Sequence, residues 1–244
     1  MPSPMTQAGS GRQALARVIY EAGTLIARYP ALALSVARWR RHGEPVGPDT
    51  ALVIEGYPRS ANSFAVAVFA VAQPGPVRIA HHVHAPAHVI EALRRHVPVL
   101  VLVRDPEEAV VEFVLLKPAL TVTQALRGWV RFYSPLVRYR HRFVAATTRE
   151  VLADPGAVIR AVNERFGTSF RESGAGAETV ARGVRAYWAD RAGPGLPLVG
   201  RTSETEVGRE ADRERLRLTY RSARLARLRA RAERLHRAIT GAAG

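Results

Sequence analysis

The sequence contains no cysteine, so disulfide bonds, thiolate metal sites and cysteine nucleophiles are excluded. Lysine is almost absent as well, because Lys117 is the only one and the other 35 of the 36 Lys and Arg residues are arginines. The chain also lacks a run of roughly 20 uninterrupted apolar residues, the length of a membrane span. The first eleven residues lack the basic start and apolar core of a signal peptide. We therefore expect a cytoplasmic protein.

The balance of charge is strongly basic, with a net charge of +15 at pH 7. Such a charge predicts affinity for anions, which include phosphorylated small molecules, nucleic acid and anionic membrane surfaces. Nucleic acid is not expected as a partner, because Tyr220 is the only aromatic residue after Trp188. The arginine-rich C-terminal part therefore lacks the interleaved aromatic side chains of single-strand binders.

Short apolar runs alternate with amphipathic stretches through the middle of the chain. We expect strands at 51–57, 77–83, 97–103 and 143–151, and helices at 61–72, 87–95, 105–116, 121–143 and 155–166. Strands that alternate with helices are typical of a parallel sheet covered by helices on both faces. The sequence therefore predicts an α/β fold, a three-layer sandwich around a central parallel sheet.

The two ends of the chain carry further helical segments. Residues 1–48 are expected to form a tail, disordered over 1–10, and a helical extension broken near Pro30, while 49–244 form one α/β domain. The extension mixes apolar residues with arginines and could pack on the core or lie on a membrane surface. Packing is favoured, because a globular domain can use such a helix at its edge.

The C-terminal region is expected to consist of a long loop and a final helix. The loop covers 171–206 around a short helix at 180–189, and includes the basic segment 201–203. Such variable loops are expected to select the substrate. The final helix is expected at 209–239, with arginines around one apolar stripe. The stripe comprises Leu218, Leu225, Leu228, Leu235 and Ile239.

A polar loop, Gly-Tyr-Pro-Arg-Ser at 56–60, joins the first expected strand to a helix. The first N–H groups of a helix lack partners and lie at the positive end of its dipole, so an anion fits there. Arg59 adds a guanidinium fork, and three side-chain donors follow at Ser60, Asn62 and Ser63. The lysine-containing loop pattern of triphosphatases is absent. The segment is either an anion-binding loop or an ordinary strand-to-helix turn.

Four of the eight histidines lie within residues 81–88. His82 and His84 are two residues apart and could ligate a metal from one face of a strand. A metal is disfavoured, because no carboxylate follows until Glu91 and cysteine is absent. One of these histidines could instead act as a general base, since histidine titrates near neutral pH. They could also be ordinary polar loop residues.

A third feature is Arg104, which directly follows an apolar run and precedes Asp105-Pro106, the expected start of a helix. Ligands of open α/β sheets bind at the carboxyl ends of the strands. Arg59 and Arg104 are therefore expected at the same edge of the sheet. Either arginine could also simply pair with a carboxylate.

Taken in order, these segments resemble the sulfotransferase family, which transfers a sulfuryl group from 3′-phosphoadenosine-5′-phosphosulfate (PAPS). The segment Pro58-Arg59-Ser60-Ala61-Asn62-Ser63-Phe64 resembles the family's 5′-phosphosulfate loop, and His84-Ala85-Pro86 resembles its His-x-Pro segment. The stretch "VLVRDPEEAV" at 101–110 resembles its 3′-phosphate segment. A Trp-x-x-x-Tyr pattern follows at Trp129, and the resemblance extends over 51–167.

The resemblance implies a P-loop-kinase-like topology and in-line sulfuryl transfer from PAPS, without a metal. The acceptor would be a hydroxyl or amine of a small molecule, lipid or glycan. The general base would be His84, with His82 as second choice, and Arg59 would stabilise charge on the leaving oxygen. The residues implied in binding PAPS are Pro58, Arg59, Ser60, Ala61, Asn62, Ser63, Phe64 and Arg104.

Four positions depart from the family pattern. Arg59 replaces a lysine, and Ala61 and Phe64 replace a glycine and a tryptophan. Glu112 stands where a serine usually donates to the 3′-phosphate, and a carboxylate beside a phosphate is repulsive. A sulfotransferase-like protein that binds nucleotide or another anion without catalysis is therefore the alternative.

Overall fold

A parallel sheet forms the centre of the computed structural model, which describes residues 4–40, 43–172, 182–187, 189 and 206–241. Its four strands run in the spatial order β2-β1-β3-β4. The strands are β1 (Leu52–Gly56), β2 (Ile79–His81), β3 (Val99–Val103) and β4 (Val144–Thr147). Both β1 and β3 are buried along their whole length, as expected for continuous apolar runs in a sheet covered on both faces.

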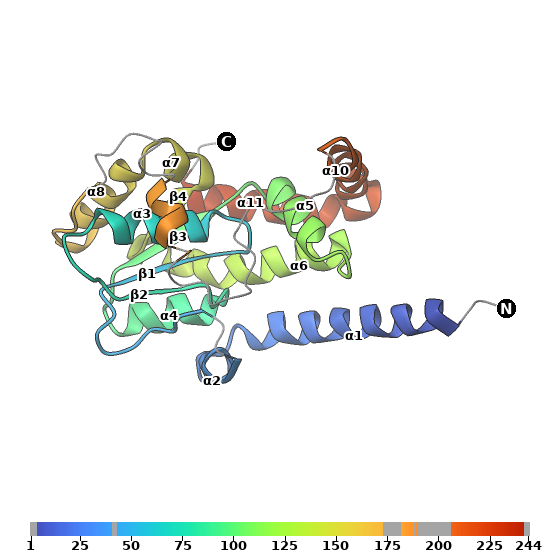
Figure 1. The fold of residues 1–244 in the computed structure, drawn as a ribbon, viewed down its shortest axis with the longest axis horizontal. Coiled ribbons are helices and arrows are strands. Elements are labelled where there is room, and N and C mark those ends of the chain that lie inside the picture. Colours follow the sequence, from blue (N-terminus) through green and yellow to red (C-terminus); the bar gives the residue numbers. More distant parts are fainter. Residues whose placement is uncertain (1–3, 41–42, 173–181, 188, 190–205, 242–244) are drawn as a thin grey trace.

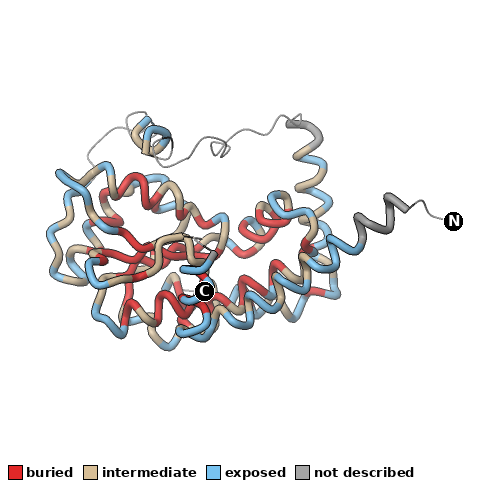
Figure 2. Tube along the Cα trace, turned by 60° about the horizontal axis from the view of Figure 1, so that its bottom comes forward, coloured by how far each residue is buried: buried red, intermediate tan, exposed pale blue. Residues whose placement is uncertain are grey.

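Helices cover the two faces of this sheet (Figure 1). On one side pack α3 (Asn62–Ala72), α7 (Thr148–Ala153) and α8 (Pro155–Phe166), and on the other α4 (Pro86–Arg94), α5 (Pro106–Leu116), α6 (Val122–Tyr133) and α11 (Ala226–Thr240). Alternate strand residues supply the two cores: Leu52 and Ile54 belong to the core with α3, whereas Val53 belongs to the opposite core. The predicted α/β fold is confirmed, and its buried residues concentrate on these central elements (Figure 2).

Four helix starts carry the side-chain caps that favour a helix at those positions. Asp105 and Asp154 cap α5 and α8, each of which has proline in its first turn. Thr121 and Thr147 form capping boxes at α6 and α7. These short-range signals explain why α5, α6 and α8 begin close to the predicted positions. The strand expected over 143–151 is too long, because β4 ends at Thr147, which caps the unpredicted helix α7.

The predicted helix over 121–143 is wrong in its length. Helix α6 ends at Tyr133, and Ser134–Arg142 continue as a 3₁₀-helix, η1. Pro135 explains the change, because proline has no N–H to donate to the carbonyl four residues earlier.

The predicted single C-terminal helix is also wrong. The structure has α10 (Glu206–Arg221) and α11, separated by a short 3₁₀ turn, η2 (Ala223–Leu225). Arg229 stabilises this break by donating to the main-chain oxygens of Tyr220 and Ser222, each at 2.7 Å. Leu218 consequently leaves the predicted apolar stripe and is exposed, while Tyr220 is buried.

The N-terminal extension forms two helices, α1 (Pro4–Ile26) and α2 (Pro30–Arg40), separated near Pro30 as predicted. Because α1 begins at Pro4, the disorder expected over 1–10 is not found in its described part. Helix α1 runs beside α6, with its amino end beyond the sheet (Figure 1). No helix in the described part of the chain is long and apolar enough to cross a membrane.

Most of the predicted loop over 171–206 lies outside the described residues, as does the basic segment 201–203. Residues 182–187 are helical, within the short helix expected at 180–189. The division of the chain into an extension and one domain stays a prediction.

Candidate functional site

The loop after β1 leaves the sheet at a point of close backbone contact. A β-carbon on Gly56 would lie 2.5 Å from the main-chain oxygen of Leu102 on β3, so only glycine fits. Arg59 and Ala61 then adopt positive φ angles of 72° and 64°. Such left-handed conformations cost about 1 kcal/mol or more for a residue with a β-carbon, and they cluster at ligand-binding loops. Ala61 stands where the resemblance has glycine, which this conformation favours.

Two buried tyrosines support this loop from the domain interior. The Tyr133 hydroxyl accepts from the main-chain N–H of Tyr57 at 3.2 Å and donates to the Leu102 oxygen at 2.6 Å. The Tyr57 hydroxyl donates to the main-chain oxygen of Ala125 at 2.9 Å. Burial raises the pKa of both tyrosines well above the usual value, so both hydroxyls remain protonated donors. The tyrosine of the predicted Trp-x-x-x-Tyr pattern therefore fixes the loop to β3.

The loop delivers the chain to the start of α3, where no side chain caps the helix. Its first internal bond is that from the Ala65 N–H to the Ala61 oxygen. The preceding N–H groups have no acceptor within the helix, and the positive end of the helix dipole lies beside them. This arrangement differs from the capped starts of α5 to α8 and is suited to an anion.

Two of the predicted donor side chains support the loop instead of facing outwards. Ser60 is fully buried and Asn62 nearly so. The Asn62 amide donates to the main-chain oxygen of Tyr57 at 3.3 Å, and the Ser63 hydroxyl lies 2.9 Å from Nε2 of His82. Phe64 is partly buried against the core beside α3. Arg59, by contrast, is exposed, and its guanidinium places a positive charge at the surface of this loop.

Arg59 and Arg104 lie at the same edge of the sheet, as the order of strands predicts. Nη1 of Arg104 donates to the main-chain oxygen of Arg59 at 3.1 Å, so the residue after β3 holds the loop after β1. Nε of Arg104 also contacts Glu108 at 3.0 Å. The predicted convergence of these two arginines is therefore present, and each of them also has a carboxylate close by.

Glu112 contacts two arginines. Its carboxylate lies 3.5 Å from Nη2 of Arg59 and 2.8 Å from Nε of Arg213 on α10. Burial alone would raise the pKa of Glu112, but the hydrogen bond and charge of Arg213, together with Arg59 and Arg104, lower it. Glu112 is thus an ionised bridge between the loop, α5 and α10. Arg213 adds a third cation at this edge, which the sequence did not indicate.

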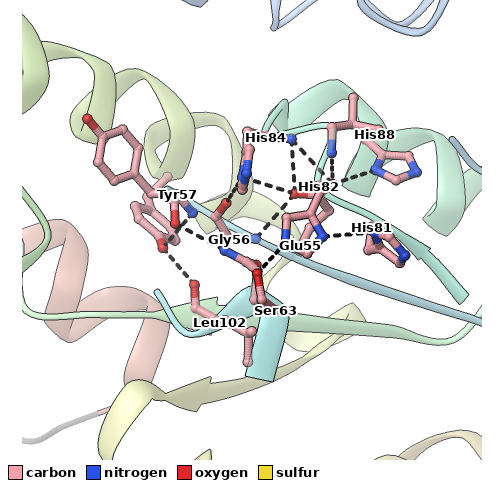
Figure 3. A network of polar contacts seen from close by, with 12 residues as sticks. Glu55, Gly56, Tyr57, Ser63, His81, His82, His84, His88 and Leu102 are labelled. Atoms are coloured by element: carbon pink, nitrogen blue, oxygen red, sulfur yellow. Dashed lines mark hydrogen bonds and ion pairs between the residues drawn. The ribbon is translucent and has the colours of Figure 1, made fainter. Parts of the chain in front are cut away.

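The histidine segment is organised around Glu55, a fully buried carboxylate on β1 (Figure 3). Its oxygens accept from the main-chain N–H groups of Val83 at 2.7 Å and His84 at 3.2 Å, and from Nδ1 of His88 at 2.9 Å. Burial alone would raise the pKa of Glu55, but the hydrogen bonds from His88 and from the main-chain N–H of Val83 lower it to about 2. Glu55 is therefore an ionised anchor for the segment after β2.

His88 is held in one tautomer. Its Nε2 accepts from the main-chain N–H of Val46 at 3.0 Å and so carries no proton. Nδ1 must then carry the proton that it donates to Glu55. His88 is completely buried, and its place is structural.

His84 and His82 differ in how their rings are held. Nδ1 of His84 lies 2.9 Å from the main-chain oxygen of Gly56, which can only accept, so this nitrogen carries a proton. In the neutral ring Nε2 is then the basic nitrogen. His82 contacts Ser63 through Nε2 and Nδ1 of His81 at 2.8 Å through Nδ1. Both His82 nitrogens therefore have neighbours within the protein.

The arrangement brings together Arg59, Arg104, His82 and His84 around the start of α3, as the order of motifs predicts. Sequence reasoning missed Glu55, His88, Tyr133 and Arg213 as supporting residues. Glu55 had a detectable signal, since a carboxylate within a buried strand requires partners. No group of three or more histidine, cysteine, aspartate or glutamate side chains in the described ranges could hold a metal ion.

A hollow of about 510 Å³ lies at the other end of the sheet. It is lined by residues around the amino end of β4, among them Arg140, His141 and Arg165. None of the predicted site residues line it. We place the candidate site at the carboxyl edge, because the uncapped helix start, the paired arginines and the histidines converge there.

The chain is similar to a known protein in structure, whereas comparisons of its sequence find no match. No protein-family model matches the sequence, and no curated protein sequence matches it. The fold is similar to that of mouse sulfotransferase SULT7A1, solved in complex with PAP, with a TM-score of 0.44 and 11% sequence identity. The match covers 78% of this chain and 90% of that chain. A similarity of this size does not assign a reaction.

Proposed function

We propose that the protein is a PAPS-dependent sulfotransferase that acts on a hydroxyl or amine of a small molecule, lipid or glycan. The observation that carries the proposal is the contact between Arg104 and Arg59 beside the uncapped start of α3. It brings the Arg104 guanidinium to the loop that carries Arg59 and leads into α3, whose first N–H groups have no acceptor within the helix. His84 adds a basic nitrogen near that edge, because its ring is fixed to Gly56 at the end of β1.

PAPS would supply the sulfuryl group and, as leaving group, 3′-phosphoadenosine-5′-phosphate (PAP). In the proposed reaction, Nε2 of His84 takes the proton from the acceptor's hydroxyl or amine. The bond from the acceptor atom to sulfur then forms while the bond from sulfur to the phosphate oxygen breaks, and the electron pair stays on that oxygen. Arg59 and the first N–H groups of α3 would stabilise the charge that develops there. Arg104 would bind the 3′-phosphate.

The arginines at this edge fit the phosphate groups of PAPS, but carboxylates contact the same arginines. Arg59, Arg104 and Arg213 contribute three positive charges, and the carboxylates that contact them, Glu108, Glu112 and Glu210, contribute three negative ones. The charges of this cluster are therefore balanced, and each guanidinium already faces a carboxylate. A phosphate would have to share these arginines with Glu108 and Glu112.

The contact between Glu112 and Arg59 favours one alternative. If the carboxylate occupies the guanidinium permanently, the site could bind an anion weakly and without catalysis. The protein would then be a sulfotransferase-like binding protein. The two proposed functions differ in whether the phosphates of PAP can displace the Glu112 carboxylate from the Arg59 guanidinium.

Replacing Glu112 by glutamine tests this point. We expect the affinity for PAP to rise about tenfold, because a negative charge close to the bound phosphates is removed and Arg59 gains freedom to contact them. Calorimetric titration with PAP measures the change. The matched control is Glu108→Gln, for which a smaller effect is expected because Glu108 is more exposed. Weaker binding of PAP by Glu112→Gln than by the wild type would show that Glu112 positions Arg59. Absence of PAP binding by both the wild type and Glu112→Gln would contradict the sulfotransferase proposal.

A further inference from the structure

Helix α1 turns an apolar stripe away from the domain. Positions three and four residues apart fall on one face of a helix. Here that face is exposed along about three turns of α1, and Val18 at its centre has 65% of its surface accessible. The apolar stripe comprises Leu15, Val18, Ile19, Ala22, Leu25 and Ile26 of α1, together with Tyr29, which follows the end of the helix. The extension packs on the domain, as favoured from the sequence, but these apolar residues of α1 take no part in that packing.

The opposite face of α1 contacts the domain through polar groups. Nε of Arg17 donates to the main-chain oxygen of Ala119 at 2.7 Å, and the Tyr20 hydroxyl lies 3.1 Å from that of Tyr57. Arg131 on α6 donates to the side chains of both Glu21 and Thr24. The amphipathic pattern is thus inverted, since the polar face packs and the apolar face is exposed. Contiguous exposed apolar surface of this kind is typical of an interaction site.

Helix α2 extends this surface. Leu32, Val36 and Trp39 lie on one of its faces and are exposed, Trp39 to 81%. The opposite face, with Ala33, Leu34 and Ala37, is buried against the domain. Tyr29 and Trp39 thus stand at the two ends of the α2 segment with their rings exposed. Exposed tyrosine and tryptophan beside aliphatic residues are the composition of a membrane interface.

The charge around the stripe identifies its partner. Residues 1–43 contain six arginines and a single carboxylate, Glu21, which contacts Arg131. Arg12, Arg28 and Arg38 flank the stripe and are exposed. A second copy of the chain would bring arginine against arginine, and this repulsion disfavours self-association through the stripe. An anionic lipid surface instead satisfies the apolar face and the flanking charges together.

We propose that α1 and α2 dock the protein on an anionic membrane surface. Both helices would lie in the plane of the interface, with the apolar stripe, Leu32, Val36 and Trp39 among the lipid headgroups and the upper acyl chains. The arginines beside the stripe would contact lipid phosphates. The contact between Tyr20 and Tyr57 connects the docked helix directly to the loop of the candidate site. This surface does not depend on the proposed sulfuryl transfer.

Vesicle binding of the full chain tests this proposal. We expect the protein to sediment with vesicles of phosphatidylcholine mixed with an equal part of phosphatidylglycerol, and much less with phosphatidylcholine alone. Val18→Glu and Leu25→Glu should each reduce the partition coefficient between vesicles and water at least about tenfold. In each variant a charge replaces an apolar side chain that would be buried among the lipids. The matched control is Leu218→Glu, an equally exposed position on α10, which should bind like the wild type.

Fluorescence provides a second measurement. Trp39 should shift its emission to shorter wavelength on addition of the anionic vesicles, and Trp39→Phe should abolish the shift. Equal vesicle binding by Val18→Glu and the wild type would overturn the proposal. So would a dimer in solution that Val18→Glu converts to a monomer, if the wild type does not bind the vesicles.

Discussion

Replacement of Glu55 by alanine is expected to lower the free energy of unfolding by about 3–5 kcal/mol. The carboxylate accepts from the N–H groups of Val83 and His84 and from His88 in a fully buried position. Its removal leaves these donors without an acceptor and creates a cavity. Chemical denaturation of the variant measures the loss. The control is Glu214→Ala on the exposed surface of α10, which should change stability by less than about 1 kcal/mol.

The same residue predicts how stability depends on pH. Because folding lowers the pKa of Glu55 from 4.5 to about 2, its contribution is complete above about pH 4.5 and is lost as the pH falls towards 2. This lowering of the pKa corresponds to about 3 kcal/mol of the free energy of unfolding. The Glu55→Gln variant should not lose this amount of stability as the pH falls, because glutamine does not titrate. Identical acid denaturation of the wild type and Glu55→Gln would contradict an ionised Glu55.

The second large effect is expected at His84. His84→Ala should reduce the rate of sulfuryl transfer by about 10²–10⁴-fold, because the proposed proton acceptor is removed. The affinity for PAP should stay close to that of the wild type. The assay follows ³⁵S from labelled PAPS into a panel of simple phenols, alcohols and amines, and uses the acceptor with the fastest turnover.

His82→Ala provides the matched comparison for His84. A smaller reduction is expected, because His82 supports Ser63 and His81 and is not the favoured base. A larger loss with His82→Ala than with His84→Ala would reverse the assignment. Unchanged transfer in both variants would exclude a histidine base at this edge.

The sequence alone predicts the sheet and its ligand edge well, because their signals are local. Short, largely apolar runs identify β1 and β3, and because these are neighbouring parallel strands, Arg59 and Arg104 lie at one edge. Caps such as Asp105 mark the helix starts. The exception is the C-terminal helix, whose break depends on Arg229 binding the end of α10 and carries no local proline or glycine signal.

The contacts that decide the chemistry of the site could not be read from sequence. Glu112 and Arg213 are 101 residues apart and meet only because α10 packs on α5. From its position alone, Glu112 indicated repulsion of a phosphate, whereas in the fold it is an ionised bridge between arginines. The orientation of α1 was equally inaccessible, since periodicity identifies an apolar stripe but not the face that packs.

Titration of the wild-type protein with PAP, repeated with Arg59→Ala and Arg104→Ala, tests the central claim most directly. We predict saturable binding of one PAP per chain, weakened at least about tenfold by each substitution because each removes a guanidinium contact to phosphate. Circular dichroism of each variant verifies that the fold is retained. Absence of saturable binding by the wild type, or equal affinity in all three proteins, would contradict a nucleotide site at this edge of the sheet.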